Sequence, residues 1–126
     1  MKMRCAVYFA FLFLAACSSG SSITEETLVF AYGPRQCESG ISLESSAQIL
    51  IDAGIDVLKS SCGAQTGYFY PAVAMCGMPS GLIWVHEIRT VNLSDAEQLG
   101  FHEISILVDA SAGAGYQLID CAIIGL

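Results

Sequence analysis

The sequence predicts a small α+β domain that is held together by disulfide bonds. Short apolar runs typical of strands alternate along the chain with two segments of helical periodicity, and turn-forming glycines and prolines separate them. Hydrophobic residues make up 54% of the 126 positions, which suits one globular domain and excludes a disordered chain. Twelve acidic residues against five basic ones exclude a protein that binds nucleic acid through positive charge.

The first residues predict a secretory signal peptide. Lys2 and Arg4 supply positive charge, and an uninterrupted apolar run follows at 5–14. Ten helical residues reach only about 15 Å, half of the roughly 30 Å hydrocarbon core, so this run is too short to span a bilayer. We therefore expect a signal peptide over residues 1–16 that is removed from the mature protein.

The residues after the apolar run resemble the lipobox of bacterial lipoproteins. Leu14-Ala15-Ala16-Cys17 places a branched apolar residue and two small residues before a cysteine. The resemblance implies cleavage before Cys17 and acylation of this residue, which would anchor the protein stably in a membrane of the cell envelope. Ser18 in place of Asp implies, by the enterobacterial sorting pattern, the periplasmic face of the outer membrane. An ordinary secretory signal with an incidental cysteine is the alternative.

A single folded domain is expected over residues 25–126, after a flexible tether at 17–24. The tether is rich in serine and glycine and has no apolar periodicity. Loss of Lys2 and Arg4 with the signal peptide leaves three basic residues against twelve acidic ones, a formal charge of −9. This charge would repel nucleic acid and anionic lipid and attract a cationic partner, although it also serves simple solubility.

The first half of the domain predicts a strand, a helix and a second strand. Residues 26–32 are rich in strand-forming side chains and end at Gly33-Pro34. Residues 42–53 show the spacing of an amphipathic helix, with Ser42 placed as its N-cap and a glycine after its last turn. Residues 55–60 alternate between apolar and polar side chains, which predicts the second strand.

The second half of the domain predicts a strand, a helix and a strand again. Residues 82–91 form the strongest strand pattern of the chain. Residues 94–97 read Ser-Asp-Ala-Glu, a capping box that opens a short helix. Residues 102–108 alternate and predict a fourth strand, and residues 116–124 predict a last strand-like extension.

This order of elements predicts a ferredoxin-like fold. Two split β-α-β units, β-α-β-β-α-β in sequence, give an antiparallel sheet with two helices on one face, here followed by a short C-terminal extension. In this topology the end of the first strand, the end of the second and the start of the third meet at one end of the sheet. Cys37, Cys62 and Cys76 would then gather there.

The four cysteines of the domain, Cys37, Cys62, Cys76 and Cys121, predict two disulfide bonds. An even number of cysteines in an oxidising envelope compartment favours disulfides, and three pairings are possible. We favour Cys62 with Cys76, which closes a short loop and is worth about 3 kcal/mol, and Cys37 with Cys121, which pins the extension. A metal site is not expected, because the chain has no Cys-x-x-Cys and only two histidines.

Three adjacent aromatic residues, Tyr68, Phe69 and Tyr70, predict a binding surface, because such a cluster is unusual in a loop. Packing of Phe69 against a disulfide is the alternative. His86 lies on the apolar face of its strand and is expected to be a hydrogen-bonded histidine or one at the rim of the core, in preference to a catalytic residue. A Cys-His nucleophile would need a free thiol, so no catalytic residue and no cofactor are expected.

The sequence therefore predicts a lipoprotein that is anchored to the envelope membrane through Cys17 and that works without catalysis, as a binding module or as an accessory subunit of an envelope complex. An acidic inhibitor or immunity-type lipoprotein that captures a cationic partner is one alternative. A thiol-dependent envelope enzyme is the other.

Overall fold

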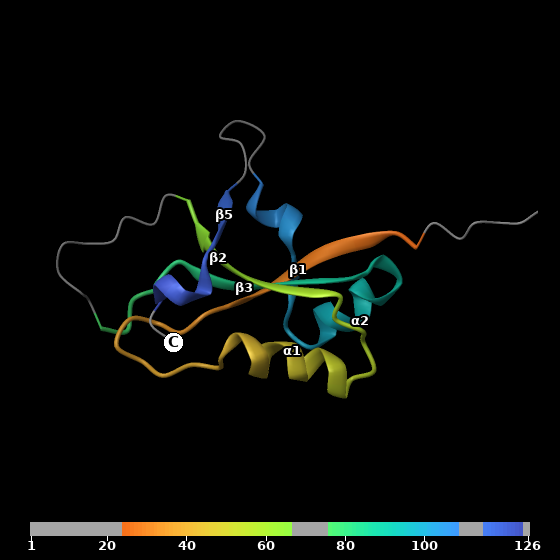
Figure 1. The fold of residues 1–126 in the computed structure, drawn as a ribbon, viewed down its shortest axis with the longest axis horizontal. Coiled ribbons are helices and arrows are strands. Elements are labelled where there is room, and N and C mark those ends of the chain that lie inside the picture. The colour runs from red at the N-terminus through yellow and green to blue at the C-terminus, as the bar shows by residue number, and fades with distance from the viewer. Residues whose placement is uncertain (1–23, 67–75, 109–114, 125–126) are drawn as a thin grey trace, which may run out of the picture.

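The computed structural model describes residues 24–66, 76–108 and 115–124. They form an α+β domain with a five-stranded antiparallel sheet, two α-helices and two disulfide bonds (Figure 1). The strands lie in the order β4-β1-β3-β2-β5. The elements are β1 (Glu26–Tyr32), α1 (Leu43–Asp52), β2 (Lys59–Gln65), β3 (Leu82–Arg89), α2 (Leu93–Gln98), β4 (His102–Glu103) and β5 (Tyr116–Ile119).

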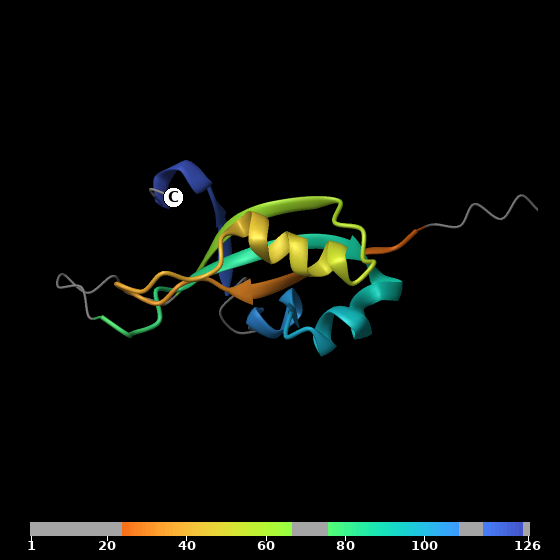
Figure 2. The same ribbon diagram turned by 90° about the horizontal axis from the view of Figure 1, so that it is seen from below.

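One face of the sheet carries both α-helices and the larger core. Figure 2 shows α1 lying across the central strands. Leu50 of α1 and Ala96 of α2 are fully buried in one cluster with Val29 and Ile88 of the sheet. This shared cluster places the two helices on the same side, as expected for one buried face of an antiparallel sheet.

The opposite face of the sheet has a smaller core that a 3₁₀ helix covers. Phe30, Ile83 and Val85 are buried there. The 3₁₀ helix Ile104–Leu107 packs its first and last side chains against them. Residues three apart lie on the same side of a 3₁₀ helix, which explains why these two apolar side chains point to the sheet together.

The first strand and the first helix confirm the sequence predictions. β1 has the predicted bounds, Glu26–Tyr32. At the start of α1 the Ser42 hydroxyl accepts a hydrogen bond from the backbone N–H of Ser45 at 3.1 Å, the geometry of an N-cap. After the helix, Gly54 has a φ of 83°, which suits glycine at a helix C-terminus.

The second strand was predicted four residues too early, over 55–60, and begins instead at Lys59. Ile55 is 2% exposed, and its backbone N–H donates to the Leu50 carbonyl at 3.0 Å, so it follows directly from α1. The apolar pattern of 55–58 therefore reflects a connection that packs into the core. The strand itself is built from small residues, Ser60 to Ala64, which its two neighbouring strands hold in place.

The predicted capping box at 94–97 is wrong. β3 ends at Arg89, and a 3₁₀ helix, Thr90–Asn92, leads directly into α2. Asn92 is the N-cap and makes no side-chain capping hydrogen bond, so Ser94 is already inside the helix. The predicted end is confirmed, because Gly100 has a φ of 96°.

The C-terminal part of the sheet also differs from the prediction. The strand expected over 102–108 is limited to His102–Glu103, because the following residues turn into the 3₁₀ helix that covers the sheet. The extension expected over 116–124 contributes a fifth strand, β5, which pairs with β2. A further 3₁₀ helix, Cys121–Ile124, follows β5.

Candidate functional site

Two loops at one end of the sheet form a cross-linked unit that we call the double loop, residues 33–37 and 76–82. The disulfide between Cys37 and Cys76 joins the two loops. Three backbone hydrogen bonds also join them: Gln36 N–H to Met78 O (3.0 Å), Gly77 N–H to Gln36 O (3.0 Å) and Gly33 N–H to Leu82 O (2.8 Å). The double loop is therefore a fixed structure at the end of β1 and the start of β3.

Side chains add further bonds between the two loops. Nη1 of Arg35 donates to the Gly77 carbonyl at 2.9 Å, and the Ser80 hydroxyl donates to the Pro34 carbonyl at 2.6 Å. Cys37 has a φ of 64°, a left-handed conformation that is uncommon for residues other than glycine. Such backbone strain persists only where the surrounding structure enforces it, and it is more frequent at binding sites than elsewhere.

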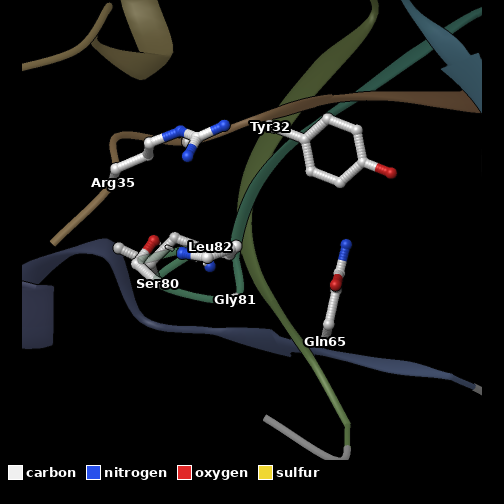
Figure 3. Close-up of a pocket in the computed structure, with 8 residues that line it drawn as sticks. Tyr32, Arg35, Gln65, Ser80, Gly81 and Leu82 are labelled. Carbon is white, nitrogen blue, oxygen red and sulfur yellow. Dashed lines mark hydrogen bonds between the residues drawn. The ribbon is translucent and has the colours of Figure 1, made fainter. Parts of the chain in front are cut away.

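A pocket of about 320 Å³ opens between the double loop and the ends of the neighbouring strands. Figure 3 shows Arg35 and Gln65 reaching toward Tyr32 from different strands and loops. The side chains that line the pocket are Tyr32, Arg35, Gln65, Pro79, Ser80 and Leu82, with Gly33 and Gly81 between them. A volume at the lower end of the range for ligand pockets suits a small molecule or the end of a chain.

The pocket differs in charge from the rest of the molecule. None of its lining residues is acidic, although the chain has twelve acidic side chains. Arg35 is exposed, and its guanidinium donates to a backbone carbonyl, that of Gly77. The ring of Tyr32 is held by edge contacts with Phe30 and His102, at 5.4 and 5.7 Å between ring centres. The pocket is thus a cationic, donor-rich spot with a fixed aromatic wall.

The pocket lies at the end of the sheet farthest from the start of the described chain. β1 pairs with β3 from Glu26 opposite Arg89 to Tyr32 opposite Ile83. Seven extended residues cover about 20 Å, so this distance separates the beginning of the strand from the pocket. Figure 1 shows the beginning of β1 and the double loop at opposite ends of the domain.

The predicted binding residues Tyr68, Phe69 and Tyr70, and the predicted lipid attachment point Cys17, lie outside the described residues. The described chain stops at Thr66 and resumes at Cys76. Thr66 follows Gln65 of the pocket, and Cys76 belongs to the double loop.

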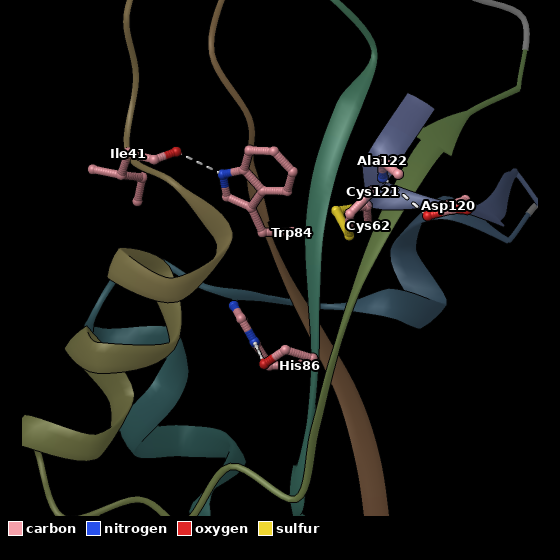
Figure 4. Close-up of a disulfide and its surroundings, with 8 residues drawn as sticks. Ile41, Cys62, Trp84, His86, Asp120, Cys121 and Ala122 are labelled. Atoms are coloured by element: carbon pink, nitrogen blue, oxygen red, sulfur yellow. Dashed lines mark hydrogen bonds between the residues drawn. A yellow bond between two sulfur atoms is a disulfide. The ribbon is translucent and has the colours of Figure 1, made fainter. Parts of the chain in front are cut away.

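All four cysteines of the domain form disulfides, as predicted, but the favoured pairing was wrong. Cys37 pairs with Cys76, and Cys62 pairs with Cys121. Because β2 begins late, Cys62 lies in the middle of the strand and is only 1% exposed. It is therefore not at the double loop, and its partner comes from the chain that follows β5, the neighbour of β2 (Figure 4).

Of the two positions expected for His86, the structure shows the hydrogen-bonded one, because the residue is buried and both ring nitrogens are bonded. Nε2 lies 2.8 Å from the Ser46 hydroxyl and Nδ1 lies 2.7 Å from the Ser60 hydroxyl. Desolvation lowers the pKa of His86 to about 4, which keeps the imidazole neutral at physiological pH. Ser46 and His86 have no exposed surface, so a substrate has no access to this Ser-His pair.

The described residues contain no group of three His, Cys, Asp or Glu side chains that could hold a metal ion. They also include no helix with the length and hydropathy needed to cross a membrane. Comparisons with protein-family models, with curated proteins and with solved structures give no match.

Sequence reasoning missed the pocket residues. Tyr32, Arg35, Gln65 and Ser80 carry no motif, and they come from two different strands and two different loops. A usable signal was present, because Gly33-Pro34 and Pro79-Ser80-Gly81 are turn sequences close to cysteines at strand ends. The predicted gathering of cysteines at one end of the sheet holds for Cys37 and Cys76.

Proposed function

We propose that this protein is a lipoprotein of the bacterial envelope that binds a ligand or a partner protein and catalyses no reaction. Cys17 would carry the lipid, and the double-loop end of the domain would be the binding surface. The observation that carries the proposal is the position of the pocket about 20 Å from the start of β1, where the tether joins. The pocket would then lie at the end of the domain opposite the tether, where a partner could reach it.

Anchoring is tested by the mass and the location of the protein in its own host. We expect the protein in the membrane fraction, with the mass of a chain that begins at Cys17 and carries acyl groups. Cys17→Ser should abolish the acyl mass, whereas the neighbouring control Ser19→Ala should keep it. A full-length chain without acyl groups would contradict the proposal.

Binding at the double-loop end is tested by photo-crosslinking in the host. A photoreactive residue at Gln65, in the pocket, should give one defined adduct that an excess of the unlabelled protein suppresses. The matched control is Gln98, which is exposed on α2 and lies outside the pocket. Equal adducts from both positions, or none from Gln65, would argue against a binding surface at this end.

We infer further that the domain has a ferredoxin-like architecture. The order β4-β1-β3-β2, antiparallel at each neighbouring pair, supports this assignment. The location of α1 and α2 on one core supports it as well. β5 is then an addition at the outer edge of β2. An experimental structure in which β4 pairs elsewhere would contradict the inference.

A second candidate function, an inhibitor of a cationic partner, is favoured by the charge of the helical layer. No lysine or arginine occurs between Arg35 and Lys59 or after Arg89, so α1 and α2 carry no positive charge. The exposed acidic side chains of this layer are Glu44, Asp52, Asp56, Asp95 and Glu97. A surface of one sign attracts an oppositely charged protein and speeds its association.

This second function is tested with lysozyme as a cationic probe. The double variant Glu44→Gln/Asp52→Asn should weaken inhibition and flatten its salt dependence, because it removes two charges from the helical layer. Glu87→Gln, which removes one charge from β3, is the control. Absence of inhibition by the unaltered protein would rule out lysozyme-like partners.

A thiol-dependent enzyme receives no support from the cysteines of the domain. All four are paired in disulfide bonds, so none of them is a free thiolate in this structure. The thiolate is the nucleophilic form of cysteine. A native protein that reacts with a thiol reagent before reduction would reopen this alternative.

A further inference from the structure

We propose that the pocket at the double loop binds a small ligand through a single carboxylate group, with Arg35 as the residue that recognises it. This inference rests on the proposed binding function and names the chemical class of the ligand. It uses described residues alone.

The first argument is the hydrogen bonding of the Arg35 guanidinium. A guanidinium has five N–H donors in a planar fork that matches the two oxygens of a carboxylate. One of these donors is used by the hydrogen bond from Nη1 to the Gly77 carbonyl at 2.9 Å. That bond fixes the side chain at the pocket and leaves the other donors for a ligand. Arg35 is therefore oriented by the protein through a neutral carbonyl, and the lining of its pocket contains no acidic residue.

The second argument is the set of side chains that line the pocket beside Arg35. The carboxamide of Gln65 extends toward Tyr32 across the pocket from the double loop (Figure 3) and adds two further N–H donors. The Ser80 hydroxyl already donates to Pro34 O and accepts from the Leu82 N–H at 3.2 Å, so it shapes the wall. A carboxylate between Arg35 and Gln65 would meet donors from both sides and no acidic side chain.

The third argument concerns charge and size. The pocket offers one cation in a domain whose formal charge is strongly negative, so a monoanion matches it better than a phosphate dianion does. Tyr32, Pro79 and Leu82 supply apolar surface beside the polar groups. A volume of about 320 Å³ then suits a carboxylate attached to a small apolar group, such as the C-terminal residue of a short peptide.

The proposal is tested by nuclear magnetic resonance titration of the full chain in detergent micelles. The probes are N-acetyl-leucine, its amide N-acetyl-leucinamide, and inorganic phosphate. We expect N-acetyl-leucine to shift the amide signals of Tyr32 and Gln65 with a Kd of roughly 1 mM, which corresponds to about −4 kcal/mol. The amide and phosphate should bind at least about tenfold more weakly. The amide has no negative charge, and the charge of a phosphate dianion is larger than the single positive charge of Arg35 can balance.

The decisive variant is Gln65→Glu, which keeps the shape of the side chain and places a negative charge opposite Arg35. It should weaken N-acetyl-leucine binding about tenfold or more without disturbing the double loop. Arg35→Lys keeps the charge but loses the planar fork, so it should also weaken binding. Arg89→Gln is the matched control, because it removes one positive charge at the opposite end of β1 and β3.

Each outcome decides the proposal. Equal binding of the acid and its amide, tighter binding of phosphate, or no shift with the acid would overturn the assignment to a carboxylate. Binding that survives Gln65→Glu would place the ligand elsewhere. These results are independent of lipid attachment. A protein that is anchored in the membrane but does not bind carboxylates would contradict this inference and leave the proposed function standing.

Discussion

The imidazole of His86 and the hydroxyl of Ser46 lie 2.8 Å apart beneath α1, and neither residue has exposed surface. Ser60 bonds the other ring nitrogen from β2, so one neutral imidazole connects three elements: α1, β2 and β3. In a neutral ring one nitrogen donates and the other accepts, and a hydroxyl can serve either role. The two hydroxyls can therefore bond the neutral ring, and it is burial of the ring that disfavours its charged form.

This buried histidine should make the fold sensitive to acid. In the unfolded chain the imidazole takes up a proton as the pH falls through 6.5, whereas in the folded chain it stays neutral until about pH 4. Unfolding therefore binds a proton between these values, and stability is lost as the pH falls from 6.5 toward 4. The loss approaches about 3 kcal/mol for this group.

Denaturant unfolding at pH 7 and at pH 4.5 measures this loss. Acidic side chains also titrate in part of this range, so the variant His86→Gln provides the comparison. It should be less stable at pH 7 and should lose less stability on acidification than the unaltered protein. A His86 ring signal that titrates near pH 6.5 in the folded protein would show that the ring is not buried as described.

Gly115 should be intolerant of any side chain. A Cβ at this position would fall on the carbonyl oxygen of Leu107, at the end of the 3₁₀ helix that covers the sheet. Gly115→Ala would push this helix away from Phe30 and Ile83, with a loss of about 2–3 kcal/mol in the free energy of unfolding.

Thermal and denaturant unfolding of Gly115→Ala check this loss against Gly100→Ala. Gly100 has a φ of 96° but nothing within 4 Å of its Cβ position, so its variant should lose only about 1 kcal/mol from backbone strain. Equal losses in the two variants would mean that close packing against Leu107 does not limit position 115.

Periodicity predicted the elements that bury one continuous apolar face. β1 and α1 were found with correct bounds or nearly so, because their patterns coincide with turn and cap residues at both ends. The position of His86 between Trp84 and Ile88 on one face of β3 predicted a site in the core or at its rim, and the structure buries it fully. Local rules worked where the local pattern and the tertiary packing agree.

The remaining features depend on contacts between distant segments. Nothing in Ser60-Ser61-Cys62-Gly63-Ala64 favours a strand, and only pairing with β3 and β5 on its two sides makes it one. The wrong bounds predicted for this strand then led to the wrong disulfide pairing, because they placed Cys62 after the end of the strand and not in its middle. The pocket was missed for the same reason, since Arg35 and Gln65 meet only after the sheet has formed.

The two disulfides should act on different parts of the domain. Their sequence separations are 39 and 59 residues, and closure of loops of this size is worth about 4 kcal/mol in the entropic description. Cys37→Ala/Cys76→Ala should loosen the double loop and abolish ligand binding in the pocket. Cys62→Ala/Cys121→Ala should free the 3₁₀ helix Cys121–Ile124 and leave the pocket intact.

Peptide mapping without reduction checks the pairing directly, and urea unfolding of the two double variants compares their stabilities. A peptide that links Cys62 to Cys76 would contradict the described pairing. Pocket binding that is lost equally in both variants would show that the two bonds support one unit and not two.

Trp84 should report the integrity of the helical face. It is the one tryptophan of the chain, it is fully buried, and its Nε1 donates to the Ile41 carbonyl at 2.9 Å (Figure 4). Trp84→Phe removes this donor and part of the buried ring, which should lower the free energy of unfolding by about 2 kcal/mol. Ile41 precedes the Ser42 cap, so the start of α1 should loosen first, and its backbone amides should exchange faster with solvent deuterium.

In the unaltered protein, the fluorescence emission of Trp84 should be blue-shifted and resistant to quenching by acrylamide until the protein unfolds. Strong quenching of the native protein would mean that this side chain is open to solvent and does not hold the segment before α1.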